Sequence, residues 1–143
     1  MKKFEFPLDR VLDWRRTQAR LEESKLERLR ADLHAIESQL AEAVRVRQES
    51  ARELITAKSV TGMELAALDD FRQASATECA KLEQASAEAG KRVTDQLVVV
   101  TAKRRDVKLL ENLRTRRLDA WNSELNREIE LEAGELFLAH LGR

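Results

Sequence analysis

The stretch Ser59-Val60-Thr61-Gly62-Met63 decides the fold, because it is the one clear interruption between two long runs of helical character. Thr61 and Glu64 form a capping-box pattern, in which the threonine hydroxyl and the glutamate carboxylate satisfy free amides at the start of a new helix. Gly62 permits a tight turn at low steric cost. Since each apolar stripe needs a surface to cover it, the break predicts a hairpin, with a small defect inside one continuous rod as the alternative.

The composition is typical of a thin helical assembly rather than of an ordinary globular domain. Charged residues make up 36% of the 143 residues, aromatic residues make up 4%, and there are 4 Gly and 1 Pro. Such a chain builds a narrow apolar seam between helices instead of a thick core. We therefore expect an all-α fold, a long two-helix antiparallel coiled-coil hairpin that forms a single domain over residues 1–143.

Charge, cysteine content and hydropathy exclude several classes of protein. The 26 basic and 26 acidic residues balance, which argues against a nucleic-acid partner for the chain as a whole. A single cysteine cannot form an internal disulfide. No signal peptide follows Met1-Lys2-Lys3, and the most apolar run, residues 97–100, is far too short to cross a bilayer. We therefore expect a cytoplasmic location.

The first helix is expected over about residues 8–58. From Leu26 to Leu40 its apolar positions recur at alternating spacings of three and four, which is the rhythm of a coiled coil. After Leu40 the next apolar candidates, Val44 and Ala51, depart from this rhythm and predict a stutter, a local unwinding of the supercoil. The expected seam before that point consists of Leu8, Leu12, Ala19, Leu26, Leu29, Leu33, Ile36 and Leu40.

The second helix is expected over about residues 64–138, after a turn at 59–63. Its seam is thin over residues 74–89, where small side chains such as Cys79 replace large apolar ones. Gly90 costs about 1 kcal/mol of helix propensity and predicts a kink or soft point. A second turn at Gly90, giving three helices, is the main alternative topology. The expected seam consists of Leu65, Leu68, Cys79, Leu82, Ala89, Val93, Leu97, Val100, Val107, Leu110, Leu118, Trp121, Leu125 and Ile129.

Folding back at Thr61 places residue n roughly beside residue 122 − n, if the register is a simple antiparallel one. The entry segment Phe4-Glu5-Phe6-Pro7 then lies close to Trp121. We expect both of its phenylalanines, Phe4 and Phe6, to pack against Trp121 and to close the open end of the hairpin. Beyond about Trp121 the second helix has no partner from its own chain. An apolar stripe nevertheless continues there with Leu125, Ile129 and Leu136.

No pattern of residues predicts catalysis, a cofactor or a metal. His34 and His140 lack metal-ligand neighbours at useful spacing, and Cys79 has no nearby histidine. There is no glycine-rich phosphate loop. A thin hairpin also offers no pocket deep enough to exclude water from a reaction. We expect a protein that is not an enzyme and that uses no cofactor, metal or small-molecule substrate.

The second helix carries a basic belt in its later half. The belt is either a set of solvated helix faces, some paired with acids on the first helix, or a docking surface for an acidic partner. RNA binding is the weaker alternative, because no aromatic residue is interleaved with the basic ones. The belt consists of Lys103, Arg104, Arg105, Lys108, Arg114, Arg116 and Arg117.

Two segments of the chain resemble the FliJ proteins of the bacterial flagellar export apparatus. Residues 4–16, Phe4-Glu5-Phe6-Pro7-Leu8-Asp9-Arg10-Val11-Leu12-Asp13-Trp14-Arg15-Arg16, are similar to the family's opening of alternating phenylalanines, a Leu, a Val/Leu-Leu pair and Arg. Residues 110–117, followed by Trp121, Glu124 and Arg127-Glu128, resemble its Glu-x-Leu-x-x-Arg segment and the aromatic and Arg-Glu positions after it. Length and the two-helix plan agree as well.

The resemblance implies a protein similar in shape to the central stalk of a rotary ATPase. FliJ proteins insert into the hexameric ring of the export ATPase and stimulate it. They also contact the membrane protein of the export gate and escort export chaperones that have released their cargo. The location implied is cytoplasmic and peripheral to the inner membrane at the flagellar base. The alternatives are the equivalent stalk of a virulence-type secretion system and a structural coiled-coil adaptor that dimerises through its seam.

Candidate contact residues follow from the charge pattern and the expected register. We expect the export-gate side at the turn end, at Leu68 and Phe71. Phe71 lies beside the seam, where it is either a core residue or an apolar anchor for a partner. The ATPase side is expected at the open end, at Arg15, Arg16, Lys108, Arg114, Arg116 and Arg117.

Overall fold

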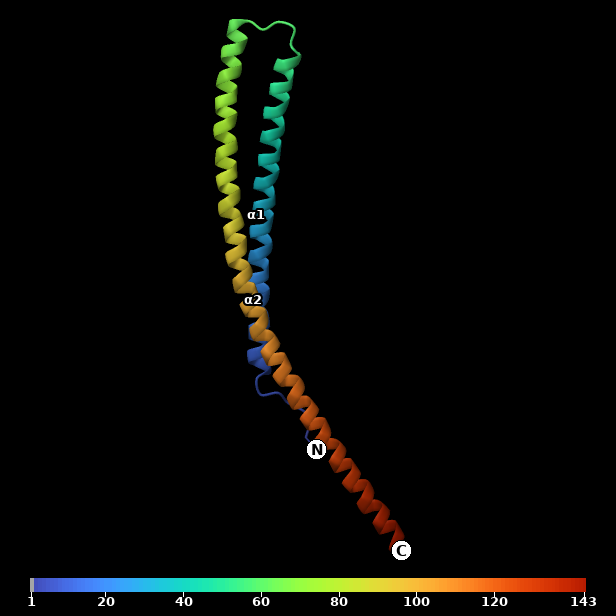
Figure 1. Cartoon of the computed structure of the whole chain (residues 1–143). Coiled ribbons are helices and arrows are strands. Elements are labelled where there is room, and N and C mark those ends of the chain that lie inside the picture. Colours follow the sequence, from blue (N-terminus) through green and yellow to red (C-terminus); the bar gives the residue numbers. More distant parts are fainter. Residues whose placement is uncertain (1) are drawn as a thin grey trace. The chain divides into compact units, whose positions relative to one another are not determined.

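The computed structural model describes residues 2–143 and contains two helices. Helix α1 spans Asp9–Thr56, with 48 residues, and helix α2 spans Gly62–Leu141, with 80 residues. A short loop joins them (Figure 1), and the described residues form no strand. The expected all-α antiparallel hairpin is therefore confirmed.

The predicted capping box is present at the start of α2. The amide of Glu64 donates to the Thr61 hydroxyl at 3.2 Å, and the amide of Thr61 donates to the Glu64 carboxylate at 3.3 Å. This reciprocal pair satisfies two amides at a helix start that would otherwise lack a partner. Gly62 is the first helical residue and has no left-handed backbone, so the turn does not depend on the conformational freedom of glycine.

The chain divides into two compact units, each of which contains part of both helices. One unit combines Met1–Leu21 with Thr101–Arg143, and its buried apolar residues are Phe6, Leu12 and Ala19. The other unit comprises Glu22–Val100, and its buried apolar residues are Leu26, Cys79, Ala89 and Val100. Each unit therefore has a narrow seam of its own between α1 and α2.

Contacts in both units fit the predicted register. In the Glu22–Val100 unit, the side-chain amide of Gln96 donates to the carbonyl of Glu22 at 3.0 Å and to its carboxylate at 2.6 Å. In the other unit, Arg15 donates to the carboxylate of Asp106 at 3.4 Å. Each partner lies within about one helical turn of position 122 − n, so the position of the turn at Thr61 placed the two helices correctly.

The predicted stutter in α1 is wrong. After Leu40 the half-buried residues of α1 are Ala43, Ser50 and Leu54, whereas Val44 and Ala51 are exposed. These positions keep the heptad register of Leu26 to Leu40, in which the intervening Arg47 is exposed. The prediction failed because it considered only larger apolar residues, whereas small side chains occupy two of these seam positions and allow close approach of the partner helix.

Three expected seam positions of α2 face solvent instead. Leu97 is 41% exposed, because the neighbouring Gln96 turns inward to bond Glu22. Leu65 and Ile129 are 50% and 54% exposed, and they lie near the two ends of α2, where α1 provides little or no cover.

Helix α2 runs without interruption through Gly90. The alternative topology of three helices is therefore wrong. A side chain at this position would have room, since a Cβ added to Gly90 meets no atom within 4 Å. That Gly90 makes the helix softer stays a prediction. In the described part of the chain, neither helix has the length and apolar character that spanning a membrane requires.

Candidate docking surfaces

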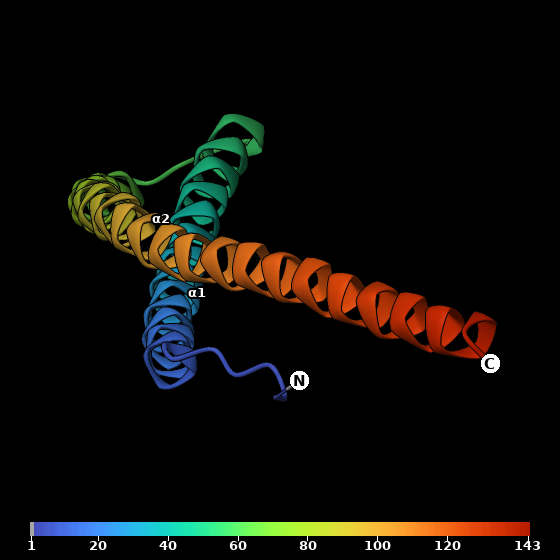
Figure 2. The ribbon, with the colours of Figure 1, turned by 90° about the horizontal axis from the view of Figure 1, so that it is seen from below.

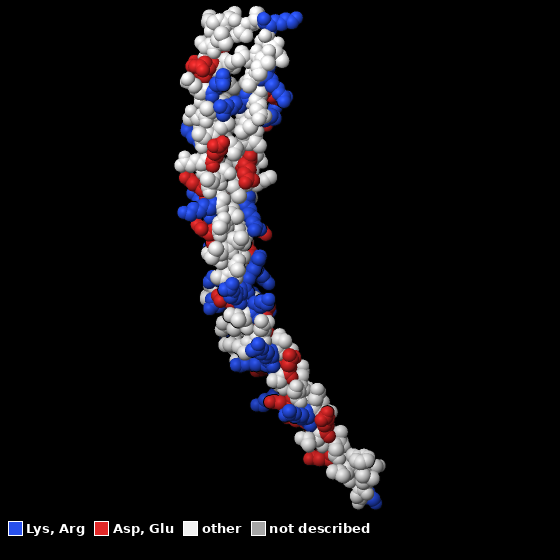
Figure 3. Space-filling view, viewed as in Figure 1, with Lys and Arg blue, Asp and Glu red and all other residues white. Residues whose placement is uncertain are grey.

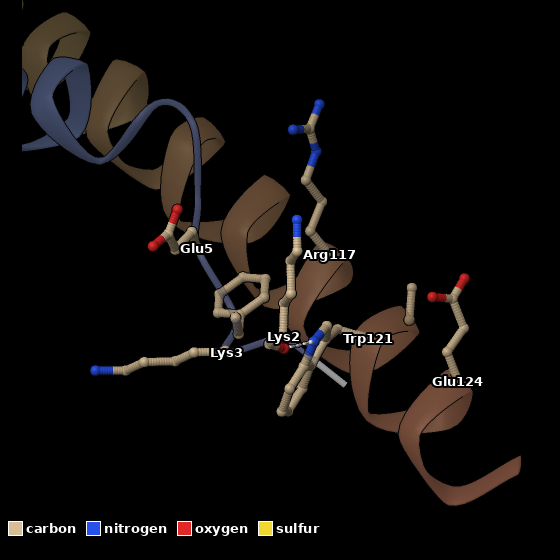
Figure 4. Close-up of a pocket in the computed structure, with 8 residues that line it drawn as sticks. Lys2, Lys3, Glu5, Arg117, Trp121 and Glu124 are labelled. Atoms are coloured by element: carbon tan, nitrogen blue, oxygen red, sulfur yellow. Dashed lines mark hydrogen bonds between the residues drawn. The ribbon is translucent and has the colours of Figure 1, made fainter. Parts of the chain in front are cut away.

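The segment that precedes α1 lies against α2 around Trp121 (Figure 4). The ring centroids of Phe4 and Trp121 are 6.0 Å apart, with a tilt of 54° between the planes. The indole Nε1 of Trp121 donates to the carbonyl of Lys2 at 3.2 Å. Phe6 is buried, with 4% of its surface exposed. One ring contact and one hydrogen bond therefore hold the entry segment on α2.

Two arginines of the predicted ATPase side also hold this segment. The guanidinium of Arg114 lies 5.7 Å from the centroid of the Phe4 ring, and that of Arg117 lies 5.8 Å from the Phe6 ring. Arg114 also donates to the carboxylate of Asp9 at 3.4 Å. Cation–π contacts at exposed sites are worth about 0.5–1 kcal/mol each. Arg114 and Arg117 therefore contribute to the packing of the open end.

Two further predicted residues join α1 to α2. Arg15 forms an ion pair with Asp106 at 3.4 Å, and Arg16 donates through two nitrogens to Glu111 at 3.1 and 3.2 Å. The side chains of Arg15 and Arg16 are 34% and 41% exposed. Ion pairs in contact with solvent contribute about 0–1 kcal/mol, so these pairs fix the register more than they stabilise the fold.

Lys108 and Arg116 differ from the other four candidates. Both are exposed, and neither makes a hydrogen bond or ion pair with any residue that the structure describes. Figure 3 shows basic and acidic side chains alternating along the visible face. The side chains of Lys108 and Arg116 are therefore the ones most available to an acidic partner.

A shallow hollow surrounds the entry segment at the open end. Its volume is about 460 Å³. Within residues 2–143 there is no group of His, Cys, Asp and Glu side chains that could hold a metal ion. The hollow is lined by Lys2, Lys3, Phe4, Glu5, Arg117, Ala120, Trp121 and Glu124.

The turn end presents a second, more apolar hollow. Leu68 and Phe71 line it together with Leu54 and Val60, in a volume of about 420 Å³. Phe71 is 39% exposed, so it lies at the edge of the seam rather than in a core. The structure thus brings the two predicted gate-side residues into one surface.

The C-terminal part of α2 is without cover from its own chain. Figures 1 and 2 show it continuing past the N-terminal segment. From residue 122 to residue 143 every residue except Leu125 is exposed, which agrees with the expected unpartnered stretch. We call residues 122–141 the overhang.

An exposed ion-pair group lies on α1, within the Glu22–Val100 unit. Arg45 donates to Glu42 at 2.6 Å and to Glu49 at 2.7 Å. The hydrogen bond and the charge of Arg45 hold the pKa of the Glu42 carboxyl below its usual value. All three residues lie on one helix at the spacing of a solvated face, so the group is a surface feature of α1.

Comparison with known protein families matches residues 4–133 to the family described as flagellar FliJ protein. The chain belongs to the FliJ family. It is therefore a component of the flagellar export apparatus. No curated protein and no solved structure matches the chain.

The FliJ match covers the entry segment, the arginines and the turn, but not the last ten residues. Those residues add apolar side chains that sequence reasoning had not singled out. Phe137, Leu138 and Leu141 are 65%, 69% and 68% exposed. The sequence signal that could have identified them is the density of apolar residues over 136–141. This run has no helical periodicity, so it was not read as a continuation of the stripe.

One further exposed aromatic residue of the FliJ chain was missed as a surface feature. Trp14 is 54% exposed, and the guanidinium of the adjacent Arg15 lies 5.1 Å from the centroid of its ring. The sequence had shown Trp14 only as part of the family-like opening, because its position is off the seam.

Proposed function

We propose that this FliJ-family protein is a non-enzymatic, stalk-like coiled coil of the flagellar export apparatus. It binds and stimulates the hexameric export ATPase, links the ring to the membrane protein of the export gate, and escorts export chaperones that have released their cargo. It works in the cytoplasm, peripherally associated with the inner membrane at the flagellar base. Membership of a flagellar family favours this function over that of a virulence-type stalk.

The observation that carries the proposal is the open end of the hairpin. There α2 extends past the start of α1, and it bears basic side chains without partners next to a packed aromatic segment. An end of this kind has the width of one or two helices, which suits insertion into the opening of a ring. Exposed charges make shallow contacts that form and break readily, as a stalk requires.

The six candidate residues have two roles in this proposal. Lys108 and Arg116 contact the acidic surface of the ATPase, because their charges have no partner among residues 2–143. The other four, Arg15, Arg16, Arg114 and Arg117, present charge as well but chiefly fix the geometry of the open end. Leu68 and Phe71 contact the export gate through the apolar hollow at the turn end.

Replacing Lys108 and Arg116 together by Ala tests the ATPase contact. We expect stimulation of the export ATPase to fall at least about fivefold at a fixed, subsaturating concentration, since about 1 kcal/mol of lost binding changes affinity by about that factor. Helicity and melting temperature should stay unchanged, because exposed charges contribute little to stability. ATPase activity and circular dichroism measure the two outcomes.

Lys81→Ala with Lys91→Ala is the matched control. It removes the same charge from exposed positions of α2 in the other unit and should leave stimulation intact. Equal stimulation by both double variants would place the ATPase contact elsewhere.

A further inference from the structure

The overhang carries an apolar stripe that continues the covered face of α2. Leu118 and Trp121 are half-buried, and Trp121 lies under the entry segment. Leu125, Ile129 and Leu136 follow at spacings that keep them on the same side of a helix. Leu125 is still half-buried, whereas Ile129 and Leu136 are 54% and 73% exposed. The apolar stripe therefore continues along α2 beyond the part that α1 and the entry segment cover.

Acidic side chains lie on this stripe and along one side of it. Glu132 and Glu135 line the same shallow hollow as Leu136 and Ala139. Over residues 122–143 there are five glutamates and two arginines, with no aspartate or lysine. At helical spacing, Glu132 falls on the stripe, Glu124, Glu128 and Glu135 fall along one side of it, and Glu130 falls on the opposite face. The surface thus combines an apolar line with a negative border, unlike the basic belt that precedes it.

We propose that the overhang pairs with an amphipathic helix of a partner protein, whose apolar stripe is flanked by lysine and arginine. The overhang is about 30 Å long, which matches a partner helix of about 20 residues. Such a helix would continue the pairing that α1 provides further along α2, and its basic flanks would face the glutamates. This docking surface includes none of the residues to which the proposed function assigns contact with the ATPase or the export gate.

The charge pattern decides against two other occupants. A second copy of the overhang, aligned antiparallel, would bring one set of glutamates against the other. An anionic membrane surface would repel the same side chains, since helices that lie on such membranes carry lysine and arginine on their polar face. An amphipathic helix with basic flanks can cover the apolar stripe and also pair with the glutamates.

A synthetic peptide tests the proposal on the intact protein. The probe is a 21-residue peptide with Leu at heptad positions a and d and Lys at e and g. Its lysines keep it monomeric and largely unfolded alone, so helicity gained on mixing reports pairing. The matched peptide has Glu at e and g. We expect the Lys peptide to bind at least tenfold more tightly than the Glu peptide, measured by fluorescence anisotropy.

Two variants locate the binding. Ile129→Asp with Leu136→Asp should weaken binding of the Lys peptide at least tenfold, whereas Val98→Asp, at an apolar position 67% exposed in the other unit, should leave it unchanged. Reversing the border with Glu128→Lys, Glu132→Lys and Glu135→Lys should transfer the preference to the Glu peptide. The export ATPase is absent, so the outcome does not depend on the proposed function.

Other results would overturn the proposal. Equal binding of the two peptides would remove the charge argument, and full binding by the Ile129→Asp, Leu136→Asp variant would move the site away from the stripe. Sedimentation of the wild-type chain as a dimer that this variant abolishes would assign the stripe to a second copy. Binding to vesicles with 30% phosphatidylserine that the same variant abolishes would assign it to a membrane.

Discussion

Phe6 links the entry segment to α1 through both its side chain and its backbone. Its ring is buried and meets Arg117 of α2, while its carbonyl accepts a hydrogen bond from the amide of Asp9 at 3.1 Å. Pro7 follows directly and favours this extended entry into the first helical turn. A single residue thus positions the segment and starts the helix.

Phe6→Ala should lower the free energy of unfolding by about 3 kcal/mol, because it removes a buried aromatic ring. Phe4→Ala should cost less, since Phe4 is only half-buried. Amide exchange should also rise at residues 118–125, where the entry segment covers α2. Urea denaturation and hydrogen exchange measure these effects.

Phe137→Ala is the control, because this ring is 65% exposed in the overhang. Its effect on unfolding should stay within about 0.5 kcal/mol. If Phe6→Ala and Phe137→Ala had equal effects, the packing of the entry segment would not contribute to stability.

At the scale of elements, the helix boundaries and the register were predictable from sequence. Both rest on local chemistry: the reciprocal Thr61–Glu64 cap and the spacing of large apolar residues. The inner seam was less predictable, because Ala43 and Ser50 are too small to stand out and Gln96 is polar. A glutamine side chain is buried only where its amide has a hydrogen-bond partner. Here one of the two acceptors on Glu22 is a backbone carbonyl, which no side-chain pattern reveals.

The candidate surfaces were less predictable from the sequence than the helices were. Charge alone identified the basic residues, and the register could have paired Arg15 with Asp106, which lies near its facing position. The hydrogen bond from Trp121 to Lys2 ends on a carbonyl, which every residue has, so no side-chain pattern reveals it. The sequence therefore indicated which residues gather at the open end but not which of them remain available.

Gly90→Ala should stabilise the hairpin by about 0.5–1 kcal/mol. Alanine has the higher helix propensity, and the added Cβ meets no atom within 4 Å. A rise in melting temperature by circular dichroism checks the effect.

Gly134→Ala makes the same exchange in the overhang, where a Cβ also has room. There the gain should leave the main transition unchanged, because residues 126–141 around Gly134 are all exposed. A fall in stability with Gly90→Ala would show that the helices approach more closely at that point than the seam allows for a methyl group.

At the scale of the whole molecule, the hairpin lets α1 and α2 of one chain cover each other's apolar seams. Glu22→Cys with Gln96→Cys, on a Cys79→Ala background, should be joined within one chain by a short bismaleimide, because Gln96 bonds directly to Glu22. Electrophoresis under denaturing conditions should show a monomer with altered mobility.

The control pair Glu22→Cys with Glu64→Cys should not crosslink within the chain. These positions are roughly 50 Å apart along the hairpin, as the register and the rise of an α-helix imply. Crosslinks that appear only between chains would support an opened dimer, the structural adaptor considered from the sequence.

The buried seam is narrow: in residues 2–143, the buried apolar side chains are Phe6, Leu12, Ala19, Leu26, Cys79, Ala89 and Val100. They are spread along the two units rather than gathered in one core, so stability accumulates locally, as in repeat proteins. Losing one part of the seam removes little apolar area and therefore changes the heat capacity little. Thermal unfolding should therefore extend over a broad range of temperature. It should begin in the parts of the hairpin that have few buried side chains. Helices α1 and α2 can then stay packed together in one part of the hairpin after they have separated in another.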